Sequence, residues 1–331
     1  MNLKDRILLL TGGTGSFGQA FIKNLLSQKD FNGVIRVFSR DEFKQHEIEE
    51  RYQNDRRLRF FIGDVRDINR LKRAMDGVDY VIHAAALKQI PILEYNPFEA
   101  VKTNILGTQN VIDCAIDFGI KKSLLISSDK ACVPVNLYGA TKMVAEKIFV
   151  QGNSYVGGRK VKLSVVRYGN VVASRGSIVP KFLEQAKNNE LTITDDRMTR
   201  FWITLDQGVK FVLKALEKME GGEIFVPKLP SIKIIDLAKT IAPNAKIKIV
   251  GIRPGEKFHE VLIGEDEARH TRDVGSYFVV EPEFNWWGAQ VKNRRGTRLK
   301  AGFSYKSNNN SQWLTSSYIN KLLRQLTENN V

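Results

Sequence analysis

The feature that most constrains the fold of this chain is a regular alternation of short apolar runs with longer amphipathic segments through its first half. The apolar runs have strand length and lie at residues 7–10, 34–38, 58–62, 80–86, 124–126 and 163–166. The segments between them have helix length and lie at residues 18–27, 41–52, 68–75, 97–118 and 138–150. Strands that alternate with helices are typical of a parallel sheet covered on both faces. The pattern therefore predicts an α/β fold with a doubly wound parallel sheet.

A glycine-rich turn follows the first apolar run and opens the first helical segment. Its glycines at 12, 15 and 18 give the spacing G-x-x-G-x-x-G. Glycine permits a tight turn and a close backbone approach, and the helix N-terminus beyond it presents unpaired N–H groups to a pyrophosphate. A strand, turn and helix in this order predict a Rossmann-type dinucleotide site. The contacts expected there are Gly12, Thr14, Gly15, Ser16, Phe17 and Gly18.

The end of the second predicted strand indicates which dinucleotide is bound. NAD sites usually place an acid there, which holds the ribose 2′-hydroxyl. Here the strand ends in Ser39 and Arg40, and Lys44 follows one helical turn later. Because an arginine and a lysine suit a 2′-phosphate, we expect NADP as the cofactor. Further cofactor contacts are expected where the third and fourth strands end, from Asp64, Val65, Ala84 and Ala86.

The second half of the chain is less regular. Helices are expected at residues 179–188, 206–218 and 232–241, strands at 223–226 and 246–250, a Pro/Gly turn at 251–257, and loop chemistry in the tail from about residue 303. We therefore expect residues 1–170 to form an NADP-binding Rossmann domain. Residues 171–331 are expected to form mainly a smaller C-terminal substrate-binding lobe, with some of the chain crossing back to the first domain.

Tyr138 and Lys142 stand four residues apart on a predicted helix, so their side chains share one face. A lysine ammonium beside a phenol lowers the pKa of the phenol, which makes the tyrosine a usable base. The pair follows the fifth predicted strand. The spacing therefore predicts an acid–base centre next to the cofactor.

Bulk properties narrow the class of protein. Lysines and arginines give a formal net charge of +15 over 331 residues, but they are spread along the chain without a nucleic-acid-binding signature, which favours an anionic small substrate. No apolar run is long enough to cross a bilayer or to serve as a secretory signal, so we expect a cytoplasmic protein without membrane contact. The two cysteines and four scattered histidines predict no metal site.

Several motifs together resemble those of a known family. They include Ser127-Ser128-Asp129-Lys130 after the fifth strand, Arg167-Tyr168-Gly169-Asn170-Val171, Met198-Thr199-Arg200-Phe201-Trp202 and Arg253-Pro254-Gly255-Glu256-Lys257. With the glycine loop, Tyr138 and Lys142, the chain resembles the extended short-chain dehydrogenase/reductase superfamily. The Asp-Lys pair is similar to that of the inverting UDP-N-acetylglucosamine 4,6-dehydratases of the pseudaminic acid, flagellin-modification type. These relatives carry Thr where Ser128 stands, and both residues offer a hydroxyl.

The resemblance implies a reaction and a set of roles. Tyr138, with Ser128 and Lys142, would remove the proton of the sugar 4-hydroxyl while C4 gives a hydride to NADP⁺. Lys130, in its neutral form, would then remove the C5 proton, and Asp129 would protonate the departing 6-hydroxyl. Return of the hydride to C6 and of a proton to the opposite face of C5 gives UDP-2-acetamido-2,6-dideoxy-β-L-arabino-hexos-4-ulose, with a tightly held NADP unchanged. The resemblance also implies that Lys88, Asn170, Arg200, Arg253 and Glu256 contact the substrate, and that Val171 contacts the cofactor.

Two other functions remain open from the sequence. A UDP-sugar 4-epimerase uses the same first step but has no need of Asp129 and Lys130. A non-catalytic NADP-binding regulator, or a nucleic-acid binder that exploits the positive charge, would also have no need of Tyr138 and Lys142. The resemblance further implies a homo-oligomer, either a dimer or a hexameric ring of dimers.

Overall fold

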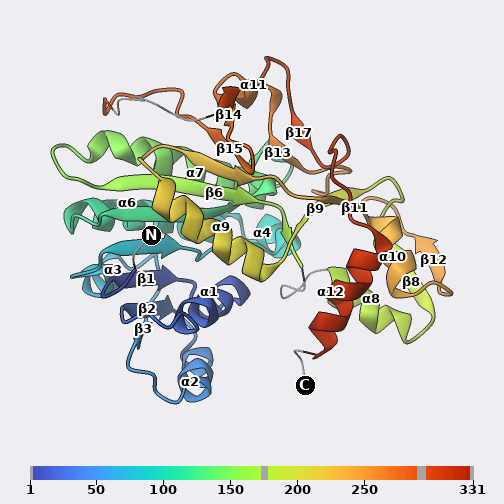
Figure 1. Cartoon of the computed structure of the whole chain (residues 1–331), viewed down its shortest axis with the longest axis horizontal. Coiled ribbons are helices and arrows are strands. Elements are labelled where there is room, and N and C mark those ends of the chain that lie inside the picture. The colour runs from blue at the N-terminus through green and yellow to red at the C-terminus, as the bar shows by residue number, and fades with distance from the viewer. Residues whose placement is uncertain (1–2, 173–177, 289–295, 329–331) are drawn as a thin grey trace.

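A ten-stranded sheet forms the centre of the molecule (Figure 1). The structure, a computed structural model, describes residues 3–172, 178–288 and 296–328. The strand order is β16-β14-β15-β10-β6-β5-β4-β1-β2-β3, and the seven strands from β10 to β3 are parallel. These seven are β1 (Ile7–Thr11), β2 (Val34–Ser39), β3 (Leu58–Ile62), β4 (Tyr80–His83), β5 (Lys122–Ser128), β6 (Lys162–Tyr168) and β10 (Ile224–Pro227). The predicted doubly wound parallel sheet is confirmed.

Helices cover both faces of this sheet. The helices that flank it are α1 (Ser16–Leu26), α2 (Glu42–Arg51), α3 (Ile68–Met75), α6 (Gly107–Asp117), α7 (Leu137–Gln151) and α9 (Leu205–Lys218). The helices α1 and α9 pack on each other, and α3, α6 and α7 form a second contiguous row. Both α7 and α9 contact β5 and β6, from opposite sides. Burial of the central strands on both faces explains why their sequences are continuous apolar runs rather than alternating ones.

A second group of elements lies beside the sheet and has its own apolar core. This group, on the right of Figure 1, contains α8 (Ile178–Ala186), α10 (Ile234–Ile241), α12 (Ser316–Glu328) and the paired strands β8 (Glu190–Ile193) and β12 (Lys246–Ile249). Its core residues include Phe182, Leu191, Leu237 and Ile319, each nearly inaccessible to solvent. A three-stranded sheet of β7 (Asn170–Val171), β9 (Thr199–Ile203) and β11 (Ser231–Lys233) runs between this core and the central sheet.

The chain crosses between the two groups several times. After β9, the helix α9 and strand β10 return to the central sheet, and β14 (Thr271–Asp273), β15 (Tyr277–Val280) and β16 (Thr297–Arg298) extend it with antiparallel pairing. The remaining elements are β13 (Val261–Ile263) paired with β17 (Tyr305–Lys306), and the short helices α4 (Ile90–Tyr95), α5 (Pro97–Ala100) and α11 (Glu265–Ala268). Chain crossing of this kind places residues of both halves around one cavity.

Three predicted elements differ from those observed. The helix predicted at 97–118 is interrupted by a π-helical stretch at Val101–Leu106. The helix predicted at 232–241 begins only at Ile234, because the preceding residues pair with β9 as the strand β11. The tail predicted as loop contains α12, whose apolar face packs on α10. In each case a tertiary contact, rather than local propensity, decides the structure.

Candidate active site

One large cavity, of about 1250 Å³, lies where the carboxyl ends of the parallel strands face the second group of elements. Open α/β sheets bind ligands at this edge. Nearly all of the predicted site residues line it. They are Gly12, Thr14, Gly15, Ser16, Phe17, Ser39, Arg40, Lys44, Asp64, Val65, Ala84, Ala86, Lys88, Ser128, Lys130, Tyr138, Lys142, Asn170, Val171, Arg200, Arg253 and Glu256. Gly18 and Asp129 lie behind the lining.

The glycine loop is shaped for close contact with a ligand backbone. Gly12 has a φ of +68°, and a Cβ there would lie 2.9 Å from the backbone nitrogen of Ala85. Gly15 is the N-cap of α1 and supplies no side chain to cap the first turn. A Cβ at Gly18 would lie 2.3 Å from the carbonyl oxygen of Gly13, so Gly18 allows α1 to pack against the turn. The loop therefore fits the phosphates of a dinucleotide, with Gly18 acting through packing.

The cations at the end of β2 are paired with carboxylates. The guanidinium of Arg40 lies 3.7 Å from Asp64, and Lys44 forms an ion pair with Asp41. More than half of the Arg40 side chain is exposed at the cavity edge. Glu47 also lines this end of the cavity. A 2′-phosphate bound here would meet two cations whose present partners are carboxylates.

The side chains of Tyr138 and Lys142 project from α7, but their electrostatics differ from the expectation. Burial raises the pKa of Tyr138; the positive charge of Lys130 and a hydrogen bond with Ser128 offset that effect only in part. Lys142 donates from Nζ to the carbonyl of Ile126 at 2.8 Å, and burial lowers its pKa to about 8. The predicted lowering of the phenol pKa is therefore wrong: burial dominates and raises it, and the largest opposing effect comes from the charge of Lys130.

The ammonium of Lys130 is held by three acceptors, one for each of its N–H groups. Nζ lies 2.9 Å from Asp129 Oδ1, 2.9 Å from Glu260 Oε1 and 2.8 Å from Asn170 Oδ1. Burial alone would lower the pKa of Lys130, but the two carboxylates outweigh it and raise the pKa. These surroundings therefore favour the charged form of Lys130, and not the neutral form in which the resemblance implies that it acts. In this arrangement Lys130 is a cation at neutral pH.

Asp129 and Ser128 complete the group at the end of β5. The Asp129 side chain is fully buried, and burial raises its pKa, as does the nearby charge of Glu260. Its Oδ1 accepts hydrogen bonds from Ser128 Oγ at 3.0 Å and from Lys130, whereas its buried Oδ2 has no partner in the part of the chain that the structure describes. A buried carboxyl of raised pKa is suited to donate a proton.

The predicted substrate residues line the part of the cavity nearest the second group of elements. Arg200 donates to the carbonyls of Thr199 and Phe258, at 2.8 and 3.1 Å. Arg253 lies 3.8 Å from Glu256, and burial lowers the pKa of Lys88. The structure thus gathers these side chains from the loop after β4, from β9 and from the turn at 251–257, although the sequence separates them widely.

Sequence reasoning missed several residues. Glu260 is 2% exposed and pairs with Lys130, and Trp202 and Thr103 line the cavity with buried polar atoms. Trp202 Nε1 and Thr103 Oγ1 have no partner among the residues described. Buried polar atoms are normally paired, so unpaired ones beside a cavity indicate ligand contacts. Trp202 stood within a motif quoted from the sequence, whereas nothing local indicated Glu260.

The π-helical stretch also serves the site. Its Asn104 accepts a hydrogen bond from the backbone nitrogen of Leu87 and donates to the Leu87 carbonyl, both at 2.9 Å. It donates a further hydrogen bond to Thr141 Oγ1 at 3.0 Å. The wider helical turn thus ties the loop after β4 to α7, which carries Tyr138 and Lys142. Stretches of π-helix occur frequently at functional sites for such reasons.

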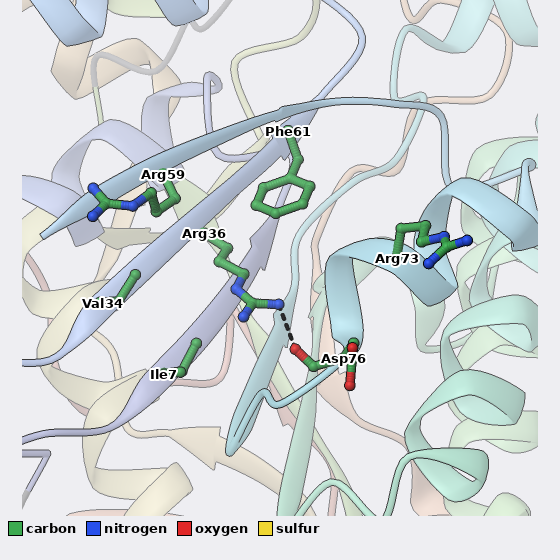
Figure 2. A pocket seen from close by; sticks show the side chains of 7 residues that line it. All are labelled: Ile7, Val34, Arg36, Arg59, Phe61, Arg73 and Asp76. Carbon is green, nitrogen blue, oxygen red and sulfur yellow. Dashed lines mark hydrogen bonds between the residues drawn. The ribbon is translucent and has the colours of Figure 1, made fainter.

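A smaller hollow of about 360 Å³ lies at the amino-end edge of β1–β3 and contains three arginines (Figure 2). Arg36 donates from Nη1 to the carbonyls of Ala74 and Asp76, at 2.9 and 2.6 Å, and so caps the end of α3. Arg59 likewise donates to the carbonyls of Arg56 and Leu58. Arg36 therefore caps a helix and Arg59 supports a loop, which accounts for their place in this hollow.

Comparison with known proteins places the chain in a family. The family described as "Polysaccharide biosynthesis protein" matches residues 8–282. The chain belongs to this family. Among the residues that the structure describes, this family member has no helix long and apolar enough to cross a membrane. No group of potential metal ligands occurs in the same described ranges.

Two curated relatives of this polysaccharide biosynthesis family member illustrate the names that its relatives carry. A protein of Campylobacter jejuni subsp. jejuni serotype O:23/36 (strain 81-176), named "UDP-N-acetylglucosamine 4,6-dehydratase (inverting)", is 51% identical over 92% of this chain and 93% of its own. A protein of Rickettsia canadensis (strain McKiel), named "UDP-glucose 4-epimerase", is 43% identical over 83% of each chain. The resemblance to the inverting UDP-N-acetylglucosamine 4,6-dehydratases that the sequence motifs indicated is confirmed.

Solved structures agree with the fold. The protein Pen from Bacillus thuringiensis superimposes with a TM-score of 0.89 and 37% identity, covering 99% of both chains. The dTDP-glucose 4,6-dehydratase DesIV from Streptomyces venezuelae, solved with NAD and TYD bound, gives a TM-score of 0.66 at 22% identity, covering 76% of this chain and 86% of its own. At that identity the likeness concerns the fold alone.

Proposed function

We propose that this chain is an NADP-dependent UDP-N-acetylglucosamine 4,6-dehydratase that inverts C5. The observation that carries the proposal is the pairing of Asp129 with Lys130 at the end of β5, with Tyr138 lining the same cavity. An elimination of water needs one group that removes the C5 proton and one that protonates the leaving hydroxyl. A pair that holds one exchangeable proton between a carboxyl and an amine supplies both. The Campylobacter relative, at 51% identity, supports the substrate and the stereochemistry.

The cavity has the features that a nicotinamide dinucleotide needs. Gly12 and Gly15 leave room for the pyrophosphate, and Arg40 and Lys44 would hold the 2′-phosphate that distinguishes NADP. Bound in this cavity, NADP would supply the acceptor for a hydride from C4 of the sugar and the donor of a hydride to C6. The residues around it fix which proton moves at each stage.

Residues of the cavity lining, with Asp129 behind them, would carry the proton transfers up to the loss of water. Tyr138 takes the proton of the 4-hydroxyl, and Ser128 supports it by the hydrogen bond that lowers its pKa. Asp129 and Lys130 share one transferable proton across a distance of 2.9 Å. Transfer of that proton from Lys130 to Asp129 produces a neutral amine, which removes the C5 proton, and a neutral carboxyl, which protonates the departing 6-hydroxyl. Because Asp129 is fully buried and burial disfavours separated charges, the neutral form of the pair is accessible.

Cations at the other end of the cavity suit a nucleoside diphosphate. Arg200, Arg253 and Lys88 line it, and Asn170 is oriented by Lys130. Arginine geometry matches diphosphate oxygens. From the resemblance we further infer the first step of pseudaminic acid synthesis for flagellin modification, a cytoplasmic location and a homo-oligomer of dimeric or hexameric form.

A 4-epimerase is the second candidate, because the Rickettsia relative bears that name. The two reactions differ in their products. We expect incubation with UDP-N-acetylglucosamine in D₂O to give a product lighter by one water, with deuterium at C5 and the L-arabino configuration by NMR. An isomer of unchanged mass would replace the dehydratase proposal with the epimerase.

A substitution at Lys130 tests the role assigned to the Asp129–Lys130 pair. We expect Lys130→Ala to stop elimination and C5 deuteration, while Lys248→Ala, on the exposed strand β12, serves as the matched control and keeps both. Normal elimination by Lys130→Ala would remove Lys130 from its role.

A further inference from the structure

We propose that Glu260 is a positioning residue of the dehydration step, which holds the Lys130 ammonium from the side away from the cavity and retains the transferable proton of the Asp129–Lys130 pair. The proposal rests on the proposed function and deepens it. Glu260 lies at the end of the segment that precedes β13, 2.9 Å from Lys130 Nζ. Lys130 lines the cavity and Glu260 does not, so Glu260 acts through Lys130 rather than on a ligand.

The backbone around Glu260 fixes the position of its carboxylate. Its N–H donates to Ser307 Oγ at 2.9 Å, and the N–H of Ser307 donates to the Glu260 carbonyl at 2.8 Å. Ser307 Oγ in turn donates to the carbonyl of Thr199 on β9. Three chain segments therefore meet at this residue, and the carboxylate is 2% exposed. A buried carboxylate anchored from both sides of its backbone is a built partner for a cation rather than a chance contact.

The charges around Glu260 define what its removal would do. The ionisable groups that face it or face Lys130 are Asp129, Lys130, Tyr138, Arg200 and Lys257. Arg200 Nε lies 3.5 Å from Glu260 Oε1. Burial would raise the pKa of Glu260, but Lys130 and Arg200 outweigh it and lower the pKa, so Glu260 stays anionic. Glu260 Oε2 is buried and has no partner within the described part of the chain.

The fixed negative charge of Glu260 shifts the pKa of Asp129 and the pKa of Lys130 in the same direction. The pair is active with one proton; a second proton removes the base, and loss of the first removes the acid. Glu260 raises the pKa of both Asp129 and Lys130. Because interacting groups titrate as a unit, the two apparent pKa values belong to the pair and not to either residue alone. Neutralisation of Glu260 therefore shifts both the acidic limb and the basic limb of the plot of kcat against pH to lower pH.

The test compares kcat and KM against pH for the full-length enzyme and three variants. Glu260→Gln keeps the shape and loses the charge, and we expect both limbs to fall by about one to three pH units. Glu260→Asp keeps the charge and withdraws it from Nζ, so we expect both limbs to move less than in Glu260→Gln while kcat falls and KM changes little. Glu265→Gln, on the exposed pair with Lys306, is the matched control and should retain the wild-type profile. Limbs that stay at the wild-type pH in Glu260→Gln would overturn the proposal.

A second measurement does not depend on turnover. NMR of protein labelled with [ε-¹³C]lysine follows the Lys130 signal, which is assigned by its loss in Lys130→Arg. We expect Lys130 of the wild type to titrate above the ordinary lysine value of about 10.4 and that of Glu260→Gln to titrate lower. A wild-type Lys130 that titrates at or below the ordinary value contradicts the role of Glu260, even if Glu260→Gln does not fold. Failure of the wild type to release a dehydrated product would instead reject the proposed function alone.

Discussion

Arg167 is the side chain whose loss should damage the site's framework most. It lies on β6 beside Ser127 and is 2% exposed. Its guanidinium contacts Glu146 of α7 at 2.6 and 3.0 Å and Glu267 of α11 at 2.8 and 2.9 Å. A further hydrogen bond reaches the carbonyl of Leu262 at 2.9 Å. Arg167→Met fills a similar volume but leaves two carboxylates without their cation.

The expected cost follows from the charges. Burial would raise the pKa of Glu267, but Arg167 outweighs it, and the pKa falls from 4.5 to about 2. A difference of about 2.5 units corresponds to about 3 kcal/mol, reduced by solvent screening because a quarter of the side chain is exposed. The substitution also leaves Glu146, which is almost fully buried, without its cation. Removal of one partner from a buried ion pair costs about 3–5 kcal/mol, so we expect that loss at pH 7.

The difference in stability between the wild type and Arg167→Met should depend on pH. A carboxyl whose pKa is lowered on folding stabilises the protein above its unfolded value and loses that contribution as the pH falls. For Glu267 this window runs from pH 4.5 down to about 2. In Arg167→Met both carboxylates are buried without a cation, so protonation stabilises the variant as the pH falls. The difference between wild type and variant should therefore narrow by about 1 kcal/mol or more between pH 7 and pH 4.

Urea unfolding, followed by circular dichroism at the two pH values, measures both effects. Arg269→Met is the control, because Arg269 pairs with Glu283 at 3.6 Å on the surface, where an ion pair contributes about 0–1 kcal/mol. A loss below about 1 kcal/mol at pH 7 for Arg167→Met would refute the reasoning, as would a difference that stays constant with pH.

Three shorter predictions concern binding. Gly12→Ala places a Cβ against the Ala85 backbone at a φ of +68°, and should weaken NADP binding at least about tenfold by calorimetry, about 1.4 kcal/mol; unchanged affinity contradicts the assigned loop. Arg40→Ala should weaken NADP binding roughly tenfold and leave NAD binding unchanged, since only NADP carries the 2′-phosphate; equal effects on both would argue for NAD. Trp202→Phe should raise KM for the nucleotide sugar, because the buried indole N–H beside the cavity has no partner in the described residues; an unchanged KM would make Trp202 a purely structural residue.

Most of the first half of the fold was predictable because most of its elements are decided by local sequence, the π-helical stretch at Val101–Leu106 being an exception. The runs at 58–62 and 68–75 coincide with β3 and α3, since apolar strands between two helical layers and capped amphipathic helices carry their own signals. The Asp67 side chain caps α3 by accepting from the Arg70 N–H at 3.0 Å. The glycine turn likewise encodes its conformation in residues that stand together in the chain.

The second half was less predictable because its strands are short and find partners far along the chain. Ser231 pairs with Phe201, and β13 pairs with β17, more than forty residues later. Two- and three-residue strands carry too few side chains for a period-2 pattern, so local sequence does not separate them from loops. The antiparallel strands that extend the central sheet after β10 were missed for the same reason.

The positions of the site residues were easier to predict than their charges. Adjacency in sequence placed Asp129 beside Lys130, and the resemblance implied a neutral amine. The sign of the shift depends on how many acceptors surround Nζ, and two of the three, Glu260 and Asn170, come from distant segments. Lys130 has three acceptors, two of which are carboxylates, and it therefore keeps its proton. In the proposed mechanism its basic form arises by transfer of that proton to Asp129 and not by release to solvent. The proposed elimination then depends on keeping that proton inside the pair, which gives a second, anchored carboxylate, that of Glu260, a physical purpose in this site.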